Sequence, residues 1–173
     1  MNRREFLKSG TIFGAFLAVG GFSLNSVTKV IGQTADLPFE KIIKTNAEWK
    51  KILTPEQYYV TREAGTEAPY SSPLTDLHDK GTFLCVCCDL PLFSSKNKFD
   101  SGTGWASFYA PINKINVLEK VDNTLAETRT EVLCHRCDAH LGHVFDDGPK
   151  PTGLRYCMNG VALKFIKESK KKA

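Results

Sequence analysis

The stretch Gly153-Leu-Arg-Tyr-Cys-Met-Asn-Gly160, which precedes the apolar run Val161–Ile166, decides how the chain is interpreted. Apolar and polar residues alternate along it, which is the two-residue period of a β-strand. The apolar set is Leu154, Tyr156 and Met158, and the polar set is Arg155, Cys157 and Asn159. An adjacent arginine favours the thiolate, the nucleophilic form of a cysteine. Cys157 is therefore a candidate nucleophile, and the alternative is a buried side chain used only for packing.

Short segments with strand composition precede this stretch from Gly81 onward, and Gly, Pro, Asn and Asp separate them. The candidate strands are Thr82–Val86, Trp105–Ile112, Asn116–Lys120, Leu125–Leu133, Val144–Phe145 and Arg155–Ile166. Many short strands with turn residues between them are typical of an antiparallel arrangement. The chain is therefore expected to be mainly β.

Two capping boxes lie on the N-terminal side of these strands. Thr45 with Glu48 opens one short helix, and Thr54 with Gln57 opens a second, which should stop at Gly65. The sequence thus predicts short N-terminal helices packed against a β domain.

A basic segment and a short apolar run open the chain. Arg3 and Arg4 are followed by Glu-Phe-Leu-Lys, and the glycine-rich run Gly10–Leu24 comes next. This layout is typical of an export signal, and the paired arginines resemble the twin-arginine type. The alternative is a short amphipathic or buried N-terminal helix. The run is too short and too rich in glycine to be expected as a membrane span. We expect an exported protein that is periplasmic, or anchored facing outward if cleavage near Gly32 does not occur.

The 173 residues suffice for one domain with a hydrophobic core. We expect a signal or anchor segment over 1–32, a linker over 33–44, one domain over 45–167 and a basic tail over 168–173. Without residues 1–32, 19 basic and 18 acidic residues remain, so the net charge is about +1. Nucleic acid would require a basic face on the domain, and none is indicated. We expect a monomer that meets a membrane only through an uncleaved signal.

Four cysteines form two matching pairs with the spacing of metal ligands. They are Cys85 and Cys88 in one CxxC knuckle, and Cys134 and Cys137 in another. Two such knuckles bring four thiolates around one tetrahedral ion, most often Zn²⁺. We expect one structural zinc ion; the alternatives are iron in the same cage, and redox-active pairs or disulfides. Cys87, inside the first knuckle, is interpreted as a packing residue, and the alternative is a part in redox chemistry.

Two histidines follow the second knuckle. His140 and His143 are three residues apart, so a regular strand would place them on opposite faces. Gly142 between them favours a β-bulge, which would turn both to the same face. Each histidine could also be a hydrogen-bonded structural residue. Neither is needed as a metal ligand, because four thiolates complete the coordination shell.

Four segments together resemble the B-type methionine sulfoxide reductases. They are the run His140-Leu-Gly-His-Val-Phe-Asp-Asp-Gly-Pro149, the run Pro151-Thr-Gly-Leu-Arg-Tyr-Cys157 and the two CxxC knuckles. The resemblance covers about residues 46–167 and implies a compact fold of two small antiparallel sheets. It also implies a peptide-methionine (R)-S-oxide reductase, whose substrates are oxidised proteins or peptides.

The resemblance assigns chemical roles to five residues. Cys157 would attack the sulfoxide sulfur and become a sulfenic acid as methionine leaves. His143 or His140 would supply the proton that the sulfoxide oxygen needs. Arg155 would lower the pKa of the thiol, and Asn159 would orient a histidine or the substrate oxygen.

Trp105 and Phe145 would bind the substrate, with the methyl group held against the Trp105 ring. Thr103 stands where many family members carry a resolving cysteine, so no intramolecular disulfide can form there. The expected reductant of the sulfenic acid is therefore an external thiol, from a thioredoxin-like or glutaredoxin-like protein or a small molecule. The rival interpretation is a zinc-stabilised binding module with an inert Cys157, because a fold does not determine a function.

Overall fold

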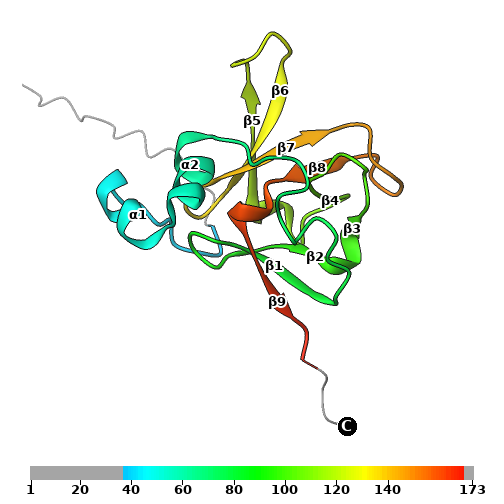
Figure 1. Ribbon diagram of the computed structural model, residues 1–173, viewed down its shortest axis with the longest axis horizontal. Coiled ribbons are helices and arrows are strands. Elements are labelled where there is room, and N and C mark those ends of the chain that lie inside the picture. Colours follow the sequence, from blue (N-terminus) through cyan, green and yellow to red (C-terminus); the bar gives the residue numbers. More distant parts are fainter. Residues whose placement is uncertain (1–36, 170–173) are drawn as a thin grey trace, which may run out of the picture. The chain divides into compact units, whose positions relative to one another are not determined.

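The computed structural model describes residues 37–169, so the expected signal segment 1–32 and the end of the basic tail lie outside the described residues. Two α-helices precede nine strands in chain order (Figure 1). The helices are α1 (Asn46–Ile52) and α2 (Pro55–Glu63). The strands are β1 (Gly81–Cys85), β2 (Pro91–Ser94), β3 (Lys98–Phe99), β4 (Ala106–Phe108), β5 (Val117–Asp122), β6 (Arg129–Cys134), β7 (His140–Phe145), β8 (Arg155–Met158) and β9 (Leu163–Lys167). Three 3-10 turns are η1 (Ser95–Asn97), η2 (Lys114–Asn116) and η3 (Gly160–Ala162).

The strands form two antiparallel sheets. The smaller has the order β2-β1-β9, and the larger has the order β3-β4-β8-β7-β6-β5. Figure 1 shows the hairpin of β5 and β6 extending away from the rest of the larger sheet. This architecture confirms the prediction of a mainly β fold with two antiparallel sheets and short N-terminal helices.

Both helices begin at the predicted capping boxes. The Thr45 side chain accepts a hydrogen bond from the backbone N–H of Glu48, and the Glu48 side chain accepts one from the backbone N–H of Thr45. Thr54 and Gln57 make the same pair of hydrogen bonds. The second helix ends at Glu63, two residues before the predicted stop, because Ala64 adopts the left-handed conformation that closes it. The buried Trp49 ring lies 4.9 Å from the guanidinium of Arg62, which anchors α1 to α2.

The predicted strand Arg155–Ile166 is wrong as a single element. It is divided into β8 and β9 by η3, and the two parts belong to different sheets. The break is held by the buried carboxylate of Glu67, which accepts from the backbone N–H groups of Gly160 at 2.6 Å and Val161 at 2.8 Å. An alternating sequence does not reveal a turn whose hydrogen bonds come from 93 residues earlier.

Three other strand predictions need new boundaries. The segment Trp105–Ile112 contributes only β4, and Leu125–Leu133 is extended only from Arg129 onward. The predicted Val144–Phe145 is the end of a longer strand, β7, whose bulge hides the two-residue period. The sequence also missed β2 and the two-residue β3, which are too short to show a pattern.

An aromatic cluster fills the space between the two sheets. Phe93 of β2 stacks on Phe108 of β4 at 4.5 Å, and Phe83 of β1 meets Phe108 edge-on at 4.9 Å. Tyr156 of β8 joins the same cluster from the larger sheet, 5.8 Å from Phe93. Because Tyr156 is buried, its neighbour Cys157 faces the opposite side of the sheet.

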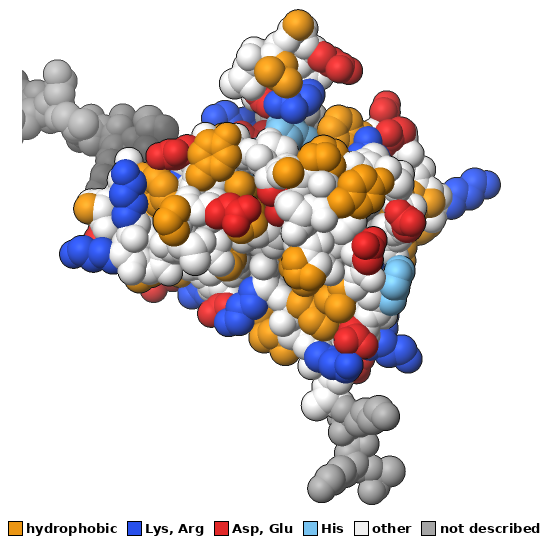
Figure 2. Space-filling view, in the orientation of Figure 1, with side chains coloured by type: hydrophobic (Ala, Val, Ile, Leu, Met, Phe, Trp, Pro, Cys, Tyr) orange, Lys and Arg blue, Asp and Glu red, His pale blue; other side chains and the backbone are white. Residues whose placement is uncertain are grey.

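No helix among residues 37–169 is long and apolar enough to cross a membrane. Acidic and basic side chains are interspersed over the face in Figure 2, in keeping with the nearly balanced charge of this part of the chain.

Candidate active site and metal centre

The four knuckle cysteines converge on one point. Their sulfur atoms all lie within 4.8 Å of one another. Cys85 Sγ is 3.7 Å from Cys137 Sγ, and Cys88 Sγ is 3.5 Å from Cys134 Sγ. Four sulfurs at about 2.3 Å from a tetrahedral zinc ion would be roughly 3.8 Å apart. The donor set and its spacing therefore fit one metal ion coordinated by four thiolates.

The two knuckles have the same backbone geometry. In each, the residue after the second cysteine has a positive φ, 57° at Asp89 and 56° at Asp138, and its N–H donates to the carbonyl of the first cysteine. Cys85 ends β1 of the smaller sheet, and Cys134 ends β6 of the larger one. A metal ion bound here links the two sheets. Phe39, in the segment expected as a linker, packs edge-on against His135 of the second knuckle at 5.9 Å.

Cys157 lies in the middle of the larger sheet, on a strand paired with β4 and β7. Its half-buried side chain opens on a pocket of about 130 Å³. The pocket is lined by Thr66, Trp105, Arg129, Gly142, His143, Phe145, Cys157 and Asn159. Five of the seven residues predicted for catalysis or substrate binding therefore share one cavity, and the other two, His140 and Arg155, do not line it.

The predicted β-bulge is present. Val132 of β6 pairs with Gly142 while Leu133 pairs with His140, so the strand carries one extra residue between the histidines. The two imidazole rings lie on the same side, with centroids 5.5 Å apart. A side chain at Gly142, where φ is 153°, would collide with the carbonyl oxygen of Cys157. Glycine is required for β7 to approach the cysteine strand this closely.

His143 is directly opposite Cys157 in the pairing of β7 with β8. Its Nε2 is 2.8 Å from Oδ2 of Asp122, which also accepts from the Arg129 guanidinium at 2.7 Å. Hydrogen bonds from the side chain and backbone of Thr124, and then from His143, hold the pKa of Asp122 well below its usual range. His143 is thus oriented by an ionised carboxylate 21 residues earlier in the chain.

His140 does not line the pocket. The ring is buried, and its Nδ1 is 2.7 Å from Oε1 of Glu131. Burial lowers the pKa of His140, and Glu131 opposes the shift only in part. The ring is therefore held neutral within the protein, beside the histidine that reaches the pocket.

The charge of Arg155 lowers the pKa of the Cys157 thiol, as expected, but burial has the larger effect and the net shift is upward. Burial raises the pKa of Cys157, and a hydrogen bond with Thr103 and the charge of Arg155 only partly offset that. Arg155 makes two bonds of 2.8 Å to Asp147, and its guanidinium lies 4.4 Å from the Phe145 ring centre. The carboxylate neutralises much of the charge that would otherwise favour the thiolate.

The raised pKa predicts how Cys157 reacts with alkylating agents. Below its pKa the thiol is protonated, and the reactive thiolate fraction grows tenfold per pH unit as the pH approaches that pKa. We expect the alkylation rate of Cys157 by iodoacetamide, followed by mass spectrometry of the metal-loaded protein, to inflect above the ordinary thiol value. The peptide Gly153–Gly160 is the matched control, since it keeps Arg155 and loses the burial. If the alkylation rate of the protein inflects at a lower pH than that of the peptide, the raised pKa of Cys157 is contradicted.

Asn159 makes no direct hydrogen bond to either histidine ring among the described residues. Its Nδ2 donates to the carbonyl of Leu141, the residue of the bulge, at 3.1 Å, and its Oδ1 accepts from the backbone N–H of Glu67 at 3.0 Å. The Glu67 carbonyl in turn accepts from the indole N–H of Trp105 at 3.3 Å. The buried Glu67 loop therefore connects Trp105, Asn159 and η3.

The sequence interpretation missed Asp122, Arg129, Glu67 and Asp147. The first two come from the β5–β6 hairpin, where an Asp-Asn turn signal was visible but gave no indication of what the hairpin reaches. Asp147 had one signal that could have been used, because it lies eight residues from Arg155 across a Gly-Pro turn. No sequence signal indicated the role of Glu67, because its hydrogen-bond partners are distant in the chain.

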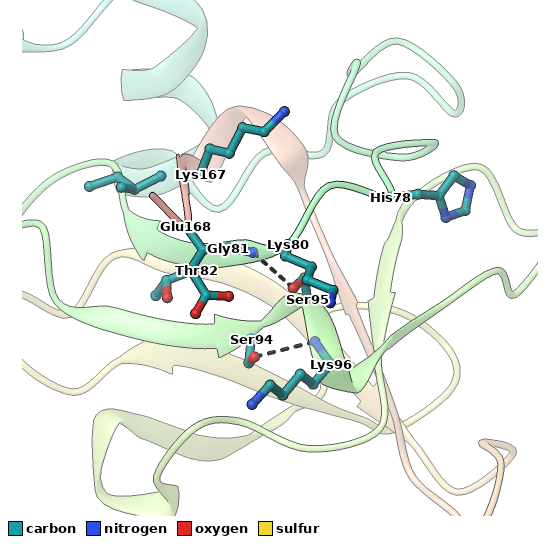
Figure 3. A pocket seen from close by; sticks show the side chains of 10 residues that line it. His78, Lys80, Gly81, Thr82, Ser94, Ser95, Lys96, Lys167 and Glu168 are labelled. Carbon is teal, nitrogen blue, oxygen red and sulfur yellow. Dashed lines mark hydrogen bonds between the residues drawn. The ribbon is translucent and has the colours of Figure 1, made fainter. Parts of the chain in front are cut away.

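A larger groove of about 730 Å³ lies beside β1, β2 and the end of β9. Its lining is mainly polar and charged, as Figure 3 shows, and the Gly81 N–H donates to the Ser95 hydroxyl at one edge. The groove contains no cysteine and no predicted site residue. The smaller pocket therefore remains the candidate active site.

The fold and the site together define a class of small β proteins. Such a protein combines a four-cysteine metal site with a separate pocket that contains an accessible cysteine and a histidine. The sequence matches the SelR domain over residues 53–167. It is 57% identical to the peptide methionine sulfoxide reductase MsrB of Herminiimonas arsenicoxydans over 126 residues, which are 73% of this chain and 92% of that protein. It is 54% identical to the same-named protein of Pseudomonas syringae pv. syringae over 130 residues, 75% of this chain and 99% of the relative.

The chain therefore belongs to the SelR domain family, together with the MsrB proteins. This confirms the family resemblance drawn from the cysteine knuckles and the two histidine- and cysteine-bearing runs.

Proposed function

We propose that the protein is a peptide-methionine (R)-S-oxide reductase with Cys157 as its nucleophile. One observation carries the proposal: Cys157, His143 and Trp105 open on the same pocket of about 130 Å³. A pocket of that size admits a small group such as a methyl sulfoxide. The names of the MsrB relatives support the same reaction class.

The reaction transfers one oxygen atom. The Cys157 thiolate attacks the sulfoxide sulfur, the oxygen takes up a proton, and methionine leaves as the oxygen moves to Cys157. Methionine sulfoxide gains two electrons and Cys157 is oxidised to a sulfenic acid. Trp105 and Phe145 hold the methyl group by sulfur–aromatic and apolar contact. Burial raises the pKa of Cys157, so the reactive thiolate is the minor form of this side chain at neutral pH.

His143 is the proton donor in this mechanism. It lines the pocket opposite Cys157, and Asp122 fixes its ring. His140 does not line the pocket and is held neutral by burial, so in this proposal it supports the bulge and not the proton transfer.

The same substitution at the two histidines separates their roles. His143→Gln is expected to lower the rate of reduction by roughly 100-fold or more, the usual contribution of a general acid. His140→Gln is expected to cost stability and to change the rate by less than about tenfold. Single-turnover rates, with far-ultraviolet circular dichroism and metal content as controls, make the comparison. A larger loss of rate in a folded His140→Gln protein would reverse the assignment.

An external thiol restores Cys157 in the proposed cycle. Thr103 provides no thiol at the position used for an internal disulfide, and Cys87 does not line the pocket. A thioredoxin-like or glutaredoxin-like protein, or a small thiol, would attack the sulfenic sulfur and release water, and a second thiol would then complete the reduction.

Introducing the absent cysteine tests this cycle. The Thr103 hydroxyl oxygen is 3.8 Å from Cys157 Sγ, so a thiol at position 103 would be close to the sulfenic acid. We expect the Thr103→Cys variant to form a disulfide between its introduced thiol and Cys157 after one turnover, detected as the loss of two thiols. The wild-type protein should form none, and a Cys87–Cys157 disulfide in it would contradict the external route.

The metal in this proposal is a structural zinc ion bound by Cys85, Cys88, Cys134 and Cys137. Four thiolates suit zinc, and they leave no coordination position for substrate. The ion stabilises the junction of the sheets and takes no part in the reaction.

Residues 1–32 are proposed to be a twin-arginine export segment that precedes the linker and the catalytic domain, which places a monomeric enzyme in the periplasm or on the outer side of the membrane. The test replaces Arg3 and Arg4 by lysine and follows where the full chain accumulates. Retention inside the cell would support the proposal, and unchanged export would contradict it.

The activity itself is tested with a peptide that contains either epimer of methionine sulfoxide and dithiothreitol as the reductant. Reduction of the R epimer only supports the proposal. A zinc-stabilised binding module would reduce neither, and reduction of the S epimer would indicate a different enzyme.

A further inference from the structure

The Thr103 hydroxyl group contacts Cys157 and begins a chain of hydroxyl groups. Its hydroxyl oxygen is 3.8 Å from Cys157 Sγ and 2.9 Å from the hydroxyl of Ser101. The Ser101 hydroxyl is 2.7 Å from that of Ser107, whose hydroxyl donates to the carbonyl of Trp105 at 3.1 Å. A continuous chain of three hydroxyl groups thus runs from the cysteine into the protein. We call Thr103, Ser101 and Ser107 the hydroxyl chain.

The inner end of this chain is shielded from water. Ser107 is fully buried on β4 and is paired directly with Cys157 in the register of β4 and β8. The two side chains therefore share one face of the sheet. Ser101 and Thr103 lie on the loop before β4, and the Tyr70 hydroxyl donates to the carbonyl of Gly102 between them at 2.9 Å. The Ser107 hydroxyl donates to the Trp105 carbonyl, and either partner can be the donor in the other three contacts of the chain.

We propose that Thr103, oriented through Ser101 and Ser107, is the hydrogen-bond donor that stabilises the ionised form of Cys157. With a neutral thiol the bonds run inward: Cys157 S–H to Thr103, Thr103 to Ser101, Ser101 to Ser107, and Ser107 to the Trp105 carbonyl. With a thiolate the three hydroxyl groups rotate and donate outward, so that Thr103 O–H points at the sulfur. The inference rests on the proposed role of Cys157 as a nucleophile.

The chain reorients without carrying the proton away. Its inner end is a backbone carbonyl, which accepts a hydrogen bond and cannot take up a proton. The proton of Cys157 therefore leaves through the pocket, and each hydroxyl keeps its own. Ionisation exchanges the Ser107 bond to the Trp105 carbonyl for a charge-assisted bond to sulfur, which is the stronger type.

This model makes opposite predictions for the two ends of the chain. Thr103→Val removes the donor to the thiolate, so the pKa of Cys157 should rise. Ser107→Ala removes the acceptor that holds the chain in its inward direction, so Ser101 donates to Thr103, and the pKa should fall. Thr103→Ser keeps the hydroxyl and should behave like the wild type.

The other charged groups around Cys157 are unchanged in these variants. They are Arg155 with Asp147 on one side, and His143 and Arg129 across the pocket. A general loss of packing would not move the pKa in two directions. The sign of the shift therefore reports the hydroxyl chain.

The experiment is the pH dependence of iodoacetamide alkylation at Cys157 in the full, metal-loaded protein, read by mass spectrometry. At neutral pH we expect Thr103→Val to react roughly tenfold more slowly than wild type, Thr103→Ser to react at the wild-type rate, and Ser107→Ala to react faster. Equal rates in the Val and Ser variants would overturn the proposal, as would a slower reaction in Ser107→Ala. Alkylation needs no sulfoxide, so a protein that shows these shifts and reduces no substrate would refute the enzyme assignment alone.

Discussion

Cys157→Ser is expected to reduce methionine-R-sulfoxide roughly 10⁴-fold more slowly than the wild type, as is usual when an enzyme loses its nucleophile. A serine hydroxyl is almost the same size as the thiol, so the pocket and the sheet should be unchanged. It remains protonated throughout the accessible pH range and is a poor nucleophile toward sulfur. The rate of peptide sulfoxide reduction with dithiothreitol is the measurement.

Cys87→Ser is the matched control. It removes one thiol that neither lines the pocket nor belongs to the cluster of four metal-binding sulfurs. We expect this variant to retain activity within a few-fold of the wild type. If the Cys157→Ser protein is the active one and Cys87→Ser the inactive one, the nucleophile is assigned to the wrong cysteine.

Loss of one knuckle cysteine is expected to unfold the protein. A structural zinc site of four thiolates contributes about 10–16 kcal/mol in small domains, whereas the net stability of a domain is about 5–15 kcal/mol. Cys134→Ser leaves three ligands at the junction of the two sheets, where β6 ends and the second knuckle begins. The free energy of unfolding should fall close to zero.

Metal analysis and thermal unfolding measure this effect together. The wild type should contain one zinc ion per chain, and a strong chelator should lower its melting temperature by tens of degrees. Cys87→Ser should keep both the metal and the stability, because Cys87 is outside the cluster of four. A stable, metal-free Cys134→Ser protein would show that the site is not structural, and iron would be recognised by its visible absorption.

Local patterns in the sequence predicted those features whose partners are close in the chain. The capping boxes at Thr45 and Thr54 each close within three residues, and both helices begin there. The bulge at Gly142 needed only the spacing of two histidines. The two CxxC knuckles predicted a four-sulfur cluster because each positions its pair by a local turn.

Features that depend on distant partners were beyond sequence patterns. The end of β8 depends on Glu67, which caps η3 from 93 residues earlier. The orientation of His143 depends on Asp122, which the β5–β6 hairpin brings back to the pocket. The direction of the pKa shift of Cys157 depends on burial, and only the packed sheet shows that burial outweighs the charge of Arg155.

The most direct measurement is the mass of Cys157 after a single turnover without any reductant. The reduced, metal-loaded protein is mixed with one equivalent of a methionine-R-sulfoxide peptide and then with dimedone, which traps sulfenic acids. Cys157 is predicted to carry the dimedone adduct, with one methionine formed for each enzyme molecule. Formation of methionine with Cys157 unmodified, or with the adduct on another cysteine, would contradict the account.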